Sequence, residues 1–367
     1  MKRVETAIVG GGPAGAATAC ALAACGREAM LIERGDCPHH KVCGEFLSVE
    51  TQAQLHALGI DPAALGAVAI DRVAVYSARR DVVSALPFRA LSLSRYRLDD
   101  ALLRRAAALG AQVERGVGVR NVTPDGEGWL VQCDDGATIA CRRLVAATGK
   151  RGLRGIEDTR DGSRVGLKMH LRLAEEAHAA LAGRVELYFV ERSYAGLELV
   201  EDGIANLCLL MPRELVAHLG GGWQPIEDYL TRALPALAER LDGSDALWDK
   251  PLAVVAPAAG HLHRGQRTAV YRVGDRLAHI PPFTGDGLAI ALASGALAAA
   301  HIRADAPPAQ YLAAARRLTG KPVRFAGLLA GLAATGAGQT ALIGAASLAP
   351  GLIDGIVRRT RLPLAAP

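Results

Sequence analysis

The first part of the chain alternates short apolar runs with an apolar helical segment. Residues 6–10 form a brief apolar run with the composition of a buried parallel strand, and an alanine-rich stretch follows it to Ala24. A second apolar run, residues 29–32, leads directly to Glu33. Continuous short apolar runs separated by one helix are typical of a parallel sheet, so the pattern predicts a strand–helix–strand unit here.

The middle of the chain has a different periodicity. Residues 73–89 alternate loosely between apolar and polar positions, and residues 165–211 alternate more clearly, with a turn signal at 201–203. Period-two alternation is typical of strands with one buried face. The two segments predict a mostly antiparallel sheet inserted into the parallel unit.

The first strand of the second segment places its chemistry on one face. Val165, Leu167 and Met169 share one side, and Lys168 and His170 lie on the other. His170 is therefore either an active-site group or part of a polar outer face of the sheet. Further along, Tyr188 and Tyr194 fit either the wall of an apolar pocket or an ordinary strand core.

The last third of the chain returns to strand and helix signals. A strand ends at Gly274-Asp275, a proline- and glycine-rich turn covers residues 281–287, and an apolar helix is expected over 288–301. Residues 325–353 then contain no charge over 29 positions, a length that could span a bilayer. Because this stretch holds six glycines and mostly alanine, we expect instead a pair of helices on the sheet, fully packed or with one edge touching lipid.

Composition narrows the classes of function. The 42 basic and 37 acidic residues are scattered, which gives a net charge of +5 without a basic block, and aromatic residues make up only 4%. This balance suits anionic ligands or a membrane surface, and it argues against a nucleic-acid partner. The seven cysteines lack the spacing of a zinc site, so no metal is expected. Their odd number and the absence of a signal peptide predict a cytoplasmic protein, with peripheral contact at the inner membrane face through the C-terminal region as an option.

The glycine-rich turn after the first strand carries a specific chemistry. Gly10 permits a tight turn, Gly12 lets a pyrophosphate approach the backbone, and Gly15 lets helix and strand pack closely. The start of the helix offers free N–H groups to phosphates. Glu33, 21 positions after Gly12, can accept hydrogen bonds from the hydroxyls of an adenosine ribose. The alternative, a glycine turn without a ligand, requires all these spacings to coincide by chance.

The second glycine motif distinguishes among dinucleotides. Asp275 can bond a ribityl hydroxyl, the prolines can flank a flavin ring, and the helix start at Gly287 can stabilise negative charge on reduced flavin. Together the motifs resemble the FAD-dependent aromatic hydroxylase and geranylgeranyl reductase superfamily, whose members share the p-hydroxybenzoate hydroxylase type of fold. The resemblance runs from Thr6 to about His301 and includes residues 41–45, 94–102 and 146–149.

The resemblance implies an α/β fold with a Rossmann-like FAD-binding domain, an inserted and mostly antiparallel β-sheet substrate domain, and a C-terminal helical tail. We expect residues 1–72, 95–160 and 262–310 in the first domain, 73–94 and 161–261 in the second, and 311–367 in the tail. The cofactor-binding residues predicted from the motifs and the resemblance are Gly10, Gly12, Pro13, Ala14, Gly15, Glu33, Arg34, Cys43, Gly44, Arg95, Thr148, Gly149, Gly274, Asp275, Pro282, Gly285, Gly287 and Leu288.

Two residues are candidates for catalysis. Cys43 is either a small buried hydrophobic residue or, in a loop that the resemblance places against the flavin, a group that tunes the site or delivers a proton. His170 is the second candidate. No other glycine cluster follows a strand and opens a helix, and residues 220–222 fit a loop, so NADPH or NADH would reach FAD only transiently.

Three functions remain open from the sequence. The leading one is a monooxygenase that hydroxylates or epoxidises a hydrophobic lipid, polyketide or prenylated aromatic substrate. The second is a reductase of the geranylgeranyl type that saturates alkene bonds; Cys43-Gly44-Glu45 favours it, and the lack of a Tyr-x-Trp-x-Phe-Pro motif disfavours it. The third is a non-catalytic flavoprotein that docks on a membrane or partner. Halogenation is disfavoured because Trp129, Trp223 and Trp248 form no Trp-x-Trp-x-Ile-Pro motif.

Overall fold

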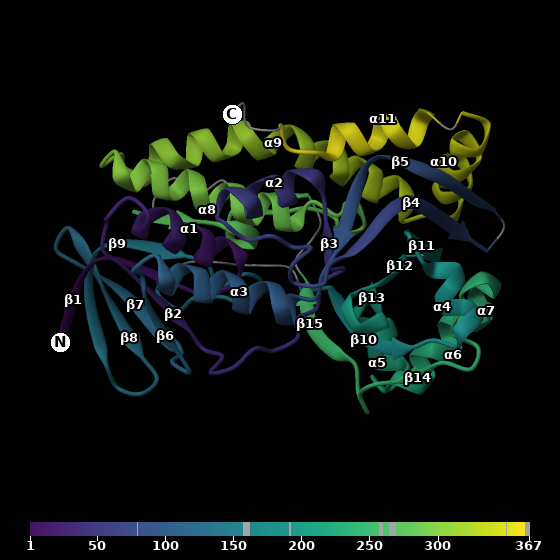
Figure 1. The fold of residues 1–367 in the computed structure, drawn as a ribbon, viewed down its shortest axis with the longest axis horizontal. Coiled ribbons are helices and arrows are strands. Elements are labelled where there is room, and N and C mark those ends of the chain that lie inside the picture. The colour runs from purple at the N-terminus through teal and green to yellow at the C-terminus, as the bar shows by residue number, and fades with distance from the viewer. Residues whose placement is uncertain are drawn as a thin grey trace.

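Two β-sheets form the centre of the molecule, and long C-terminal helices lie along both of them (Figure 1). The computed structural model describes residues 1–78, 80–156, 162–190, 192–256, 260–263, 269–349 and 351–363. The predicted boundary between residues 160 and 161 lies outside these ranges.

The first sheet has seven strands in the order β6-β2-β1-β9-β8-β7, with β17 paired to β9. Four neighbouring pairs, β6·β2, β2·β1, β1·β9 and β9·β17, are parallel, and β7 and β8 add an antiparallel edge. The parallel strands are buried because helices cover them, as expected for apolar runs without alternation. The strands are β1 (Lys2–Val9), β2 (Ala29–Glu33), β6 (Gln112–Arg115), β7 (Val119–Asp125), β8 (Gly128–Cys133), β9 (Thr138–Ala146) and β17 (Val270–Arg272).

The second sheet has nine strands in the order β14-β10-β13-β12-β11-β4-β5-β3, with β15 paired to β10. Its pairs are antiparallel except for β4·β11. It begins earlier in the chain than residue 73, since β3 and the start of β4 belong to it. The strands are β3 (Phe46–Leu47), β4 (Val68–Ser77), β5 (Asp81–Ser92), β10 (Arg164–Arg172), β11 (Arg184–Val190), β12 (Ser193–Leu199), β13 (Ala205–Pro212), β14 (Asp245–Ala246) and β15 (Leu252–Ala256). A separate short pair joins β16 (His261–Leu262) to β18 (Ala278–His279).

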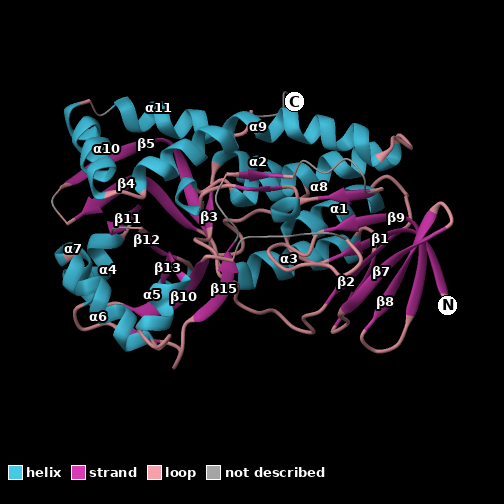
Figure 2. Ribbon diagram, turned by 180° about the vertical axis from the view of Figure 1, so that it is seen from behind, coloured by secondary structure: helices cyan, strands magenta, loops and turns pink. Residues whose placement is uncertain are grey.

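Helices cover the sheets in three groups. The first group packs with the parallel sheet around one core and comprises α1 (Pro13–Ala23), α2 (Val49–Ala57), α3 (Arg95–Ala108), α8 (Gly287–Arg303) and α9 (Pro308–Ala333). The second covers one face of the second sheet and comprises α4 (Glu175–Leu181), α5 (Arg213–His218), α6 (Trp223–Ala233) and α7 (Pro235–Leu241). The third, α10 (Gly336–Leu348) and α11 (Gly351–Thr360), packs on its strands β4, β5 and β11. Figure 2 shows α9 and α11 running along the same side of the molecule.

The charge-free tail forms helices on the sheets. No single helix among the described residues is long and apolar enough to cross a membrane; α9 and α10 reach that length only together, and they are bent by 112° at their junction. Ile353 and Ala346 are buried against Ile70 and Val73 of β4. The tail therefore adds a wall to the second sheet.

Candidate functional site

The turn between β1 and α1 needs glycine for steric reasons. Gly10 has φ +110°, and a Cβ there would lie 2.4 Å from the carbonyl oxygen of Ala147. A Cβ on Gly15 would lie 1.9 Å from the carbonyl oxygen of Gly10. No side chain fits at either distance, so these two glycines fix how closely β1, α1 and the end of β9 approach one another.

Gly12 differs because its missing side chain faces open space. A Cβ at this position would have only Arg95 Nη2 within 4 Å, at 3.6 Å. Gly12 is the N-cap of α1 and no side chain caps it, while Pro13 and Ala14 form the first turn. The first N–H groups of α1 thus point to an open site beside a guanidinium group, which is the environment an anionic pyrophosphate requires.

Glu33 lies at the end of β2, next to the same turn. Its Oε2 accepts a hydrogen bond from the Gly11 N–H at 2.6 Å, and its Oε1 accepts one from the Gly35 N–H at 3.0 Å. These bonds hold the carboxylate rigidly and leave it lone pairs for hydroxyl donors. Arg34, the neighbouring predicted residue, is exposed.

Arg95 is held in place by an acid four residues along α3. Its Nε and Nη2 donate to Asp99 Oδ1 and Oδ2 at 2.6 and 2.7 Å, and Lys41 Nζ lies 3.3 Å from Asp99 Oδ2. Burial opposes ionisation of Asp99, but Arg95 and Lys41 outweigh it and hold its pKa below the ordinary value. The fork geometry fixes the Arg95 guanidinium beside Gly12.

The second glycine motif packs against the first. Gly274 has φ +59°, and a Cβ there would lie 3.0 Å from the Cβ of Ala14 in α1. Asp275 Oδ1 lies 3.7 Å from His279 Nδ1. The structure therefore brings Asp275 to the start of α1, although about 260 residues separate the two motifs.

Three further predicted segments lie at this site. Thr148 Oγ1 donates to the Arg151 carbonyl at 2.7 Å, and Gly149 has φ +62° with open space at its Cβ position. Gly285 has φ +74°, and a Cβ there would lie 2.7 Å from the Phe46 ring. Gly287 begins α8 and also faces open space, while Leu288 is buried beneath it.

FAD fits the residues present. The would-be Cβ positions of Gly44, Gly149 and Gly287 have no atom within 4 Å, and that of Gly12 has only the arginine. Open glycine positions at two helix N-termini, α1 and α8, match the two electron-rich parts of FAD, its pyrophosphate and the pyrimidine end of its ring. Glu33 beside the first turn and Asp275 beside the start of α1 would supply acceptors for the ribose and the ribityl chain.

The loop that carries Cys43 and Gly44 is anchored by a buried carboxylate. Glu45 has φ +60° and no exposed surface, and its Oε1 accepts from Lys168 Nζ at 2.5 Å and from the Arg95 N–H at 2.7 Å. Burial raises the pKa of Glu45, but His170 and Lys168 outweigh that effect and lower it overall. Cys43 Sγ accepts from the Glu45 N–H at 3.3 Å. The contacts of the Glu45 carboxylate with Lys168 and with the Arg95 N–H thus stabilise the strained backbone conformation of Glu45.

His170 lies in this buried cluster and is not on a solvent-facing surface. It is 5% exposed, its Nε2 lies 3.4 Å from Glu45 Oε2, and its ring stacks on Trp248 with centroids 4.7 Å apart. His40 meets His170 edge to face, at 4.7 Å between centroids. Burial, followed by His170 and Lys168, lowers the pKa of His40 to about 4, which keeps that ring neutral.

The cluster also has the spacing of a metal site. His40, Glu45 and His170 present ligand atoms within 4.8 Å of one another. The ammonium of Lys168, already 2.5 Å from Glu45 Oε1, opposes a second cation at this position. Repulsion by Lys168 thus argues against a metal ion here, and the absence of a metal stays a prediction.

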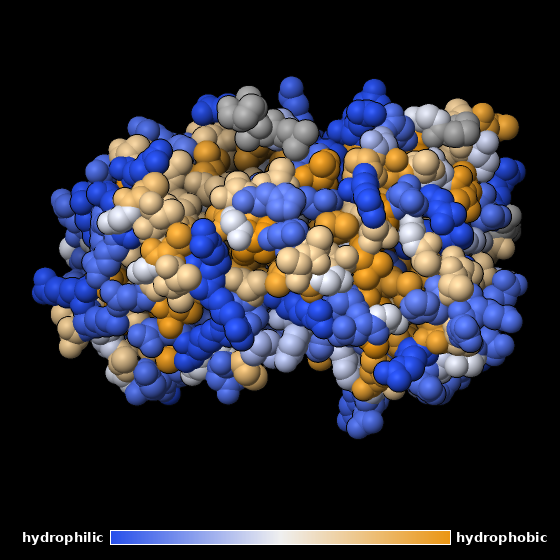
Figure 3. Space-filling model, in the orientation of Figure 1, coloured by the Kyte–Doolittle hydropathy of each residue, from blue (hydrophilic) through white to orange (hydrophobic). Residues whose placement is uncertain are grey.

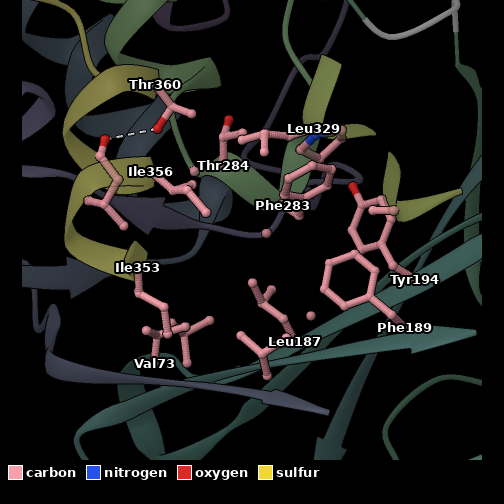
Figure 4. Close-up of a pocket in the computed structure, with 18 of the residues that line it drawn as sticks. Val73, Leu187, Phe189, Tyr194, Phe283, Thr284, Leu329, Ile353, Ile356 and Thr360 are labelled. Atoms are coloured by element: carbon pink, nitrogen blue, oxygen red, sulfur yellow. Dashed lines mark hydrogen bonds between the residues drawn. The ribbon is translucent and has the colours of Figure 1, made fainter. Parts of the chain in front are cut away.

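An apolar cavity extends from Gly44 and the turn at residues 282–285 across the second sheet to the C-terminal helices (Figure 4). Gly44, Pro282 and Gly285 form its end at the cofactor site, and it encloses about 1330 Å³ including the part open to solvent. Val73 and Leu187 rise from the sheet, and Ile353 and Ile356 face them from α11. The cavity thus takes its walls from the second sheet, the turn at residues 282–285 and helices α9, α10 and α11.

The two candidate pocket tyrosines lie on opposite faces of the sheet. Tyr194 lines the cavity and meets Phe283 edge to face at 5.6 Å between centroids. Tyr188 has no exposed surface and stacks on Tyr76, and its hydroxyl donates to Glu186 at 2.5 Å. Tyr194 therefore fits the pocket interpretation and Tyr188 the core interpretation.

The sequence interpretation missed the polar groups in the cavity wall. Glu198 and Cys208 line it, and Asn206 Nδ2 donates to Glu198 Oε1 at 2.9 Å. Burial raises the pKa of Glu198 to about 8 and that of Cys208 to about 12. The sequence signal for these groups was Glu198 itself, a carboxylate at an alternating position of an otherwise apolar strand. In β12 the run from Tyr194 to Leu199 begins with tyrosine, as the Tyr-x-Trp-x-Phe-Pro motif does, but has Gly196, Glu198 and Leu199 where the motif would have tryptophan, phenylalanine and proline.

Comparison with known proteins agrees with this site. Residues 3–161 match the FAD binding domain family. The chain is 26% identical over 322 residues to menaquinone reductase of Mycolicibacterium smegmatis, covering 81% of this chain and 76% of that protein. It is 28% identical over 327 residues to digeranylgeranylglycerophospholipid reductase 2 of Methanopyrus kandleri, covering 84% and 80%.

The fold is also that of solved flavoproteins. The structure of the flavin-dependent brominase Bmp2 superposes with a TM-score of 0.80 at 19% identity, covering 98% of this chain and 93% of that one. At this identity the likeness concerns the fold alone. Residues 3–161 thus form an FAD binding domain, and the glycine cradle and the two motifs brought together agree with the resemblance to p-hydroxybenzoate hydroxylase-like flavoproteins.

Proposed function

We propose that this FAD-dependent oxidoreductase hydrogenates a carbon–carbon double bond in a substrate with a long hydrocarbon chain. The observation that carries the proposal is the apolar cavity, which begins at Gly44 and Gly285 beside the cofactor cradle and continues to α11. Burying methylene groups in such a cavity stabilises a complex by about 0.8 kcal/mol each. The two curated relatives are named as reductases of a menaquinone and of a digeranylgeranyl lipid, which supports the same substrate class.

The chain's contribution is to hold, orient and shield the reactants. The N-terminus of α1 with Arg95 would hold the pyrophosphate of FAD, Glu33 the adenosine ribose, and Asp275 with the start of α8 the flavin half. When bound and reduced, FAD supplies a hydride, that is two electrons with one proton, to the double bond. The apolar walls exclude water and fix the alkene next to the cradle.

A second candidate is the monooxygenase that the sequence placed first. It is favoured by the departure of Gly196 and Glu198 from the motif of the reductase branch. Both reactions need reduced flavin, a dry site and a proton, so they differ in whether dioxygen takes part. The reductase is placed first here because the cavity suits a chain and the curated relatives cover most of this sequence.

NADPH or NADH would deliver electrons during a transient visit. Among the described residues, the turn at Gly220–Gly222 follows α5 and begins α6, so it has no strand before it. The strand–turn–helix at Gly10 is taken by the FAD site. A nicotinamide would therefore meet the flavin from solvent, or another protein would supply the electrons.

Peripheral membrane contact is part of the proposal. Leu328, Leu332 and Leu348 are 71%, 52% and 88% exposed on α9 and α10, next to Leu329, which lines the cavity. Figure 3 shows apolar surface toward the α10 end of the molecule. Exposed leucines on α9 and α10, together with exposed Arg358 and Arg359 on α11, suit an anionic lipid surface. We place the protein in the cytoplasm, at the inner face of the membrane.

The test compares products with and without oxygen. Holoprotein is reduced with dithionite under argon and mixed with a polyprenyl quinone, and the extracted products are oxidised back to the quinone before mass spectrometry, so that only hydrogenation of the side chain adds hydrogen. We expect a gain of two hydrogen atoms without oxygen, and no gain with a Gly12→Val variant that cannot hold FAD. A product that gains one oxygen atom, formed only in air, would establish the monooxygenase instead, and an unchanged quinone under both conditions would favour a non-catalytic docking protein.

A further inference from the structure

A row of polar side chains crosses three strands beneath the cavity. In the pairing of β10, β13 and β12, His170 lies opposite Asn206, and Asn206 lies opposite Glu198. The adjacent row on the same face holds Lys168, Cys208 and Gly196. Directly paired residues share a face of a sheet, so these groups face the cavity and the Cys43 loop while their neighbours face the apolar core on the other side.

Within this row Glu198 occupies a distinctive position. It is 2% exposed, and no other aspartate or glutamate lines the cavity in the described part of the chain. Asn206 Nδ2 donates to its Oε1 at 2.9 Å and to the Cys43 carbonyl oxygen at 3.2 Å. One amide thus connects the carboxyl group to the loop that bears Gly44, at the cofactor end of the cavity.

The surrounding charges leave Glu198 without a cation of its own. Lys168 is 2.5 Å from Glu45 Oε1 and is therefore committed to that carboxylate, and among the described residues none forms an ion pair with Glu198. A buried carboxyl without a cation is more stable protonated. The groups that face it and could alter its titration are Lys168 and His170 of β10, Cys208 of β13, Tyr194 of β12, Cys43 and Glu45 of the loop, and Arg361, which lines the same cavity.

We infer that Glu198 is the acid of the reaction, donating its proton to one carbon of the substrate double bond while the other carbon receives hydride from reduced FAD. This inference rests on the proposed reductase function. The π bond is replaced by two C–H bonds, the Glu198 O–H bond breaks, and FAD is oxidised by two electrons. Glu198 remains as a carboxylate and takes a proton from water that enters when the product leaves. Asn206 holds the carboxyl toward the cofactor end throughout.

The first experiment detects the proton itself, without turnover. Infrared spectra of the holoprotein without substrate should contain at pH 6 the C=O band of the Glu198 carboxylic acid beside that of Asp286, whose pKa burial raises to about 7. The Glu198 band should weaken near pH 8, where burial has moved the pKa of that residue, and it should be missing in Glu198→Gln, where only the Asp286 band remains. If that variant kept the band that weakens near pH 8, another group would carry the proton and the inference would be overturned.

The second experiment measures whether the reaction uses the Glu198 proton. Reduced enzyme is mixed anaerobically with a polyprenyl quinone in a single turnover, and the rate of side-chain hydrogenation is followed by quenching and mass spectrometry, because flavin reoxidation would also report reduction of the quinone ring. Glu198→Gln, which keeps an acceptor for Asn206, should retain FAD and react about 100-fold more slowly, the usual contribution of a general acid. The control Glu214→Gln changes an exposed carboxylate on α5 and should react at the wild-type rate.

The outcomes separate the two proposals. If wild-type enzyme hydrogenates the quinone and Glu198→Gln does so equally fast, the role of Glu198 is wrong and the reductase stands. If wild-type enzyme hydrogenates nothing and inserts oxygen in air, the reductase is wrong, and proton donation to an alkene carbon is wrong with it.

Discussion

Arg361 donates from Nη1 to Oδ1 of Asp286 at 2.6 Å, which joins the segment after α11 to the N-cap of α8. Both side chains are buried, and the guanidinium lies 4.8 Å from the ring centroid of Phe88. The C-terminal wall of the cavity is thereby connected to the helix start that would face the flavin. The Arg361–Asp286 ion pair therefore connects the substrate end of the site to its cofactor end.

Substitution of Arg361 should make stability strongly pH-dependent. Burial, partly offset by Arg361, raises the pKa of Asp286 from 3.8 to about 7. Between these values the folded state holds a proton that the unfolded state has lost, so stability falls as pH rises from about 4 to about 7. In Arg361→Gln the pKa of Asp286 rises further, so the free energy of unfolding should continue to fall above pH 7. At pH 8 we expect this variant to be about 3 kcal/mol less stable than the wild type. Urea unfolding at pH 6 and pH 8 measures both values.

The control for that experiment is Arg359→Gln, because Arg359 is exposed on α11. It should unfold like the wild type at both pH values. If Arg361→Gln lost the same free energy of unfolding at pH 6 and at pH 8, Asp286 would not titrate in this interval.

Gly12→Val should abolish FAD binding without unfolding the protein. The backbone of Gly12 has φ −70° and ψ 179°, which valine adopts readily, and its Cβ would enter open space. The branched side chain then occupies the place of the pyrophosphate. Purified wild type should be yellow and release FAD, not FMN, on denaturation, whereas the variant should be colourless with an unchanged circular dichroism spectrum. Full FAD occupancy in the variant would remove this turn from the cofactor site.

Asp275→Ala should weaken FAD retention more than His170→Ala. Asp275 lies beside the start of α1, where it would bond the flavin half directly, and a lost bond that leaves its partner unpaired costs about 1 to 3 kcal/mol. His170 lies on the other side of the Glu45 loop, packed on Trp248. Equilibrium titration of the two apoproteins with FAD gives the comparison. Equal dissociation constants would contradict the role of the Gly274-Asp275 motif.

Substrate affinity should rise with chain length, and Gly196→Trp should remove that dependence. Gly196 lines the cavity, and its would-be Cβ meets only Leu187, at 3.7 Å. An indole there would fill the space near the cofactor end, while each methylene of a bound chain contributes about 0.8 kcal/mol in the wild type. Binding of alkyl quinones of increasing length, with FAD content measured in parallel, tests this. Tighter binding of a short, charged aromatic acid by the wild type would overturn the apolar substrate class.

The sequence predicted the local parts of this site well. The turn at Gly10–Gly15 and the Gly274-Asp275 motif are contiguous signals whose steric needs are met within a few residues, so their conformations could be inferred directly. The alternation around Met169 correctly separated Lys168 and His170 from the apolar face. Whether that polar face met solvent could not be predicted, because it is buried by Glu45 and Trp248, far away in the chain.

Glu198 could not be assigned from its own neighbourhood. Its environment depends on the pairing of β12 with β13, which sets Asn206 opposite it, and on the loop that ends at Glu45. Likewise, the charge-free tail predicted helices, but not that Ile353 and Ile356 would line the cavity or that Arg361 would reach Asp286. Such contacts arise from tertiary packing, which periodicity does not encode.

The late position of α11 in the chain has a consequence for protein synthesis. Domains fold from the N-terminus as the ribosome makes them, yet here β1 pairs with β9, β9 pairs with β17, and α11 closes the cavity. A nascent chain therefore carries strands β4, β5 and β11 with an uncovered apolar face until α11 has been synthesised. Premature stop codons before α11 would leave that face permanently open, so we expect such truncated chains to be cleared by chaperones and proteases, not to persist as partly active flavoproteins.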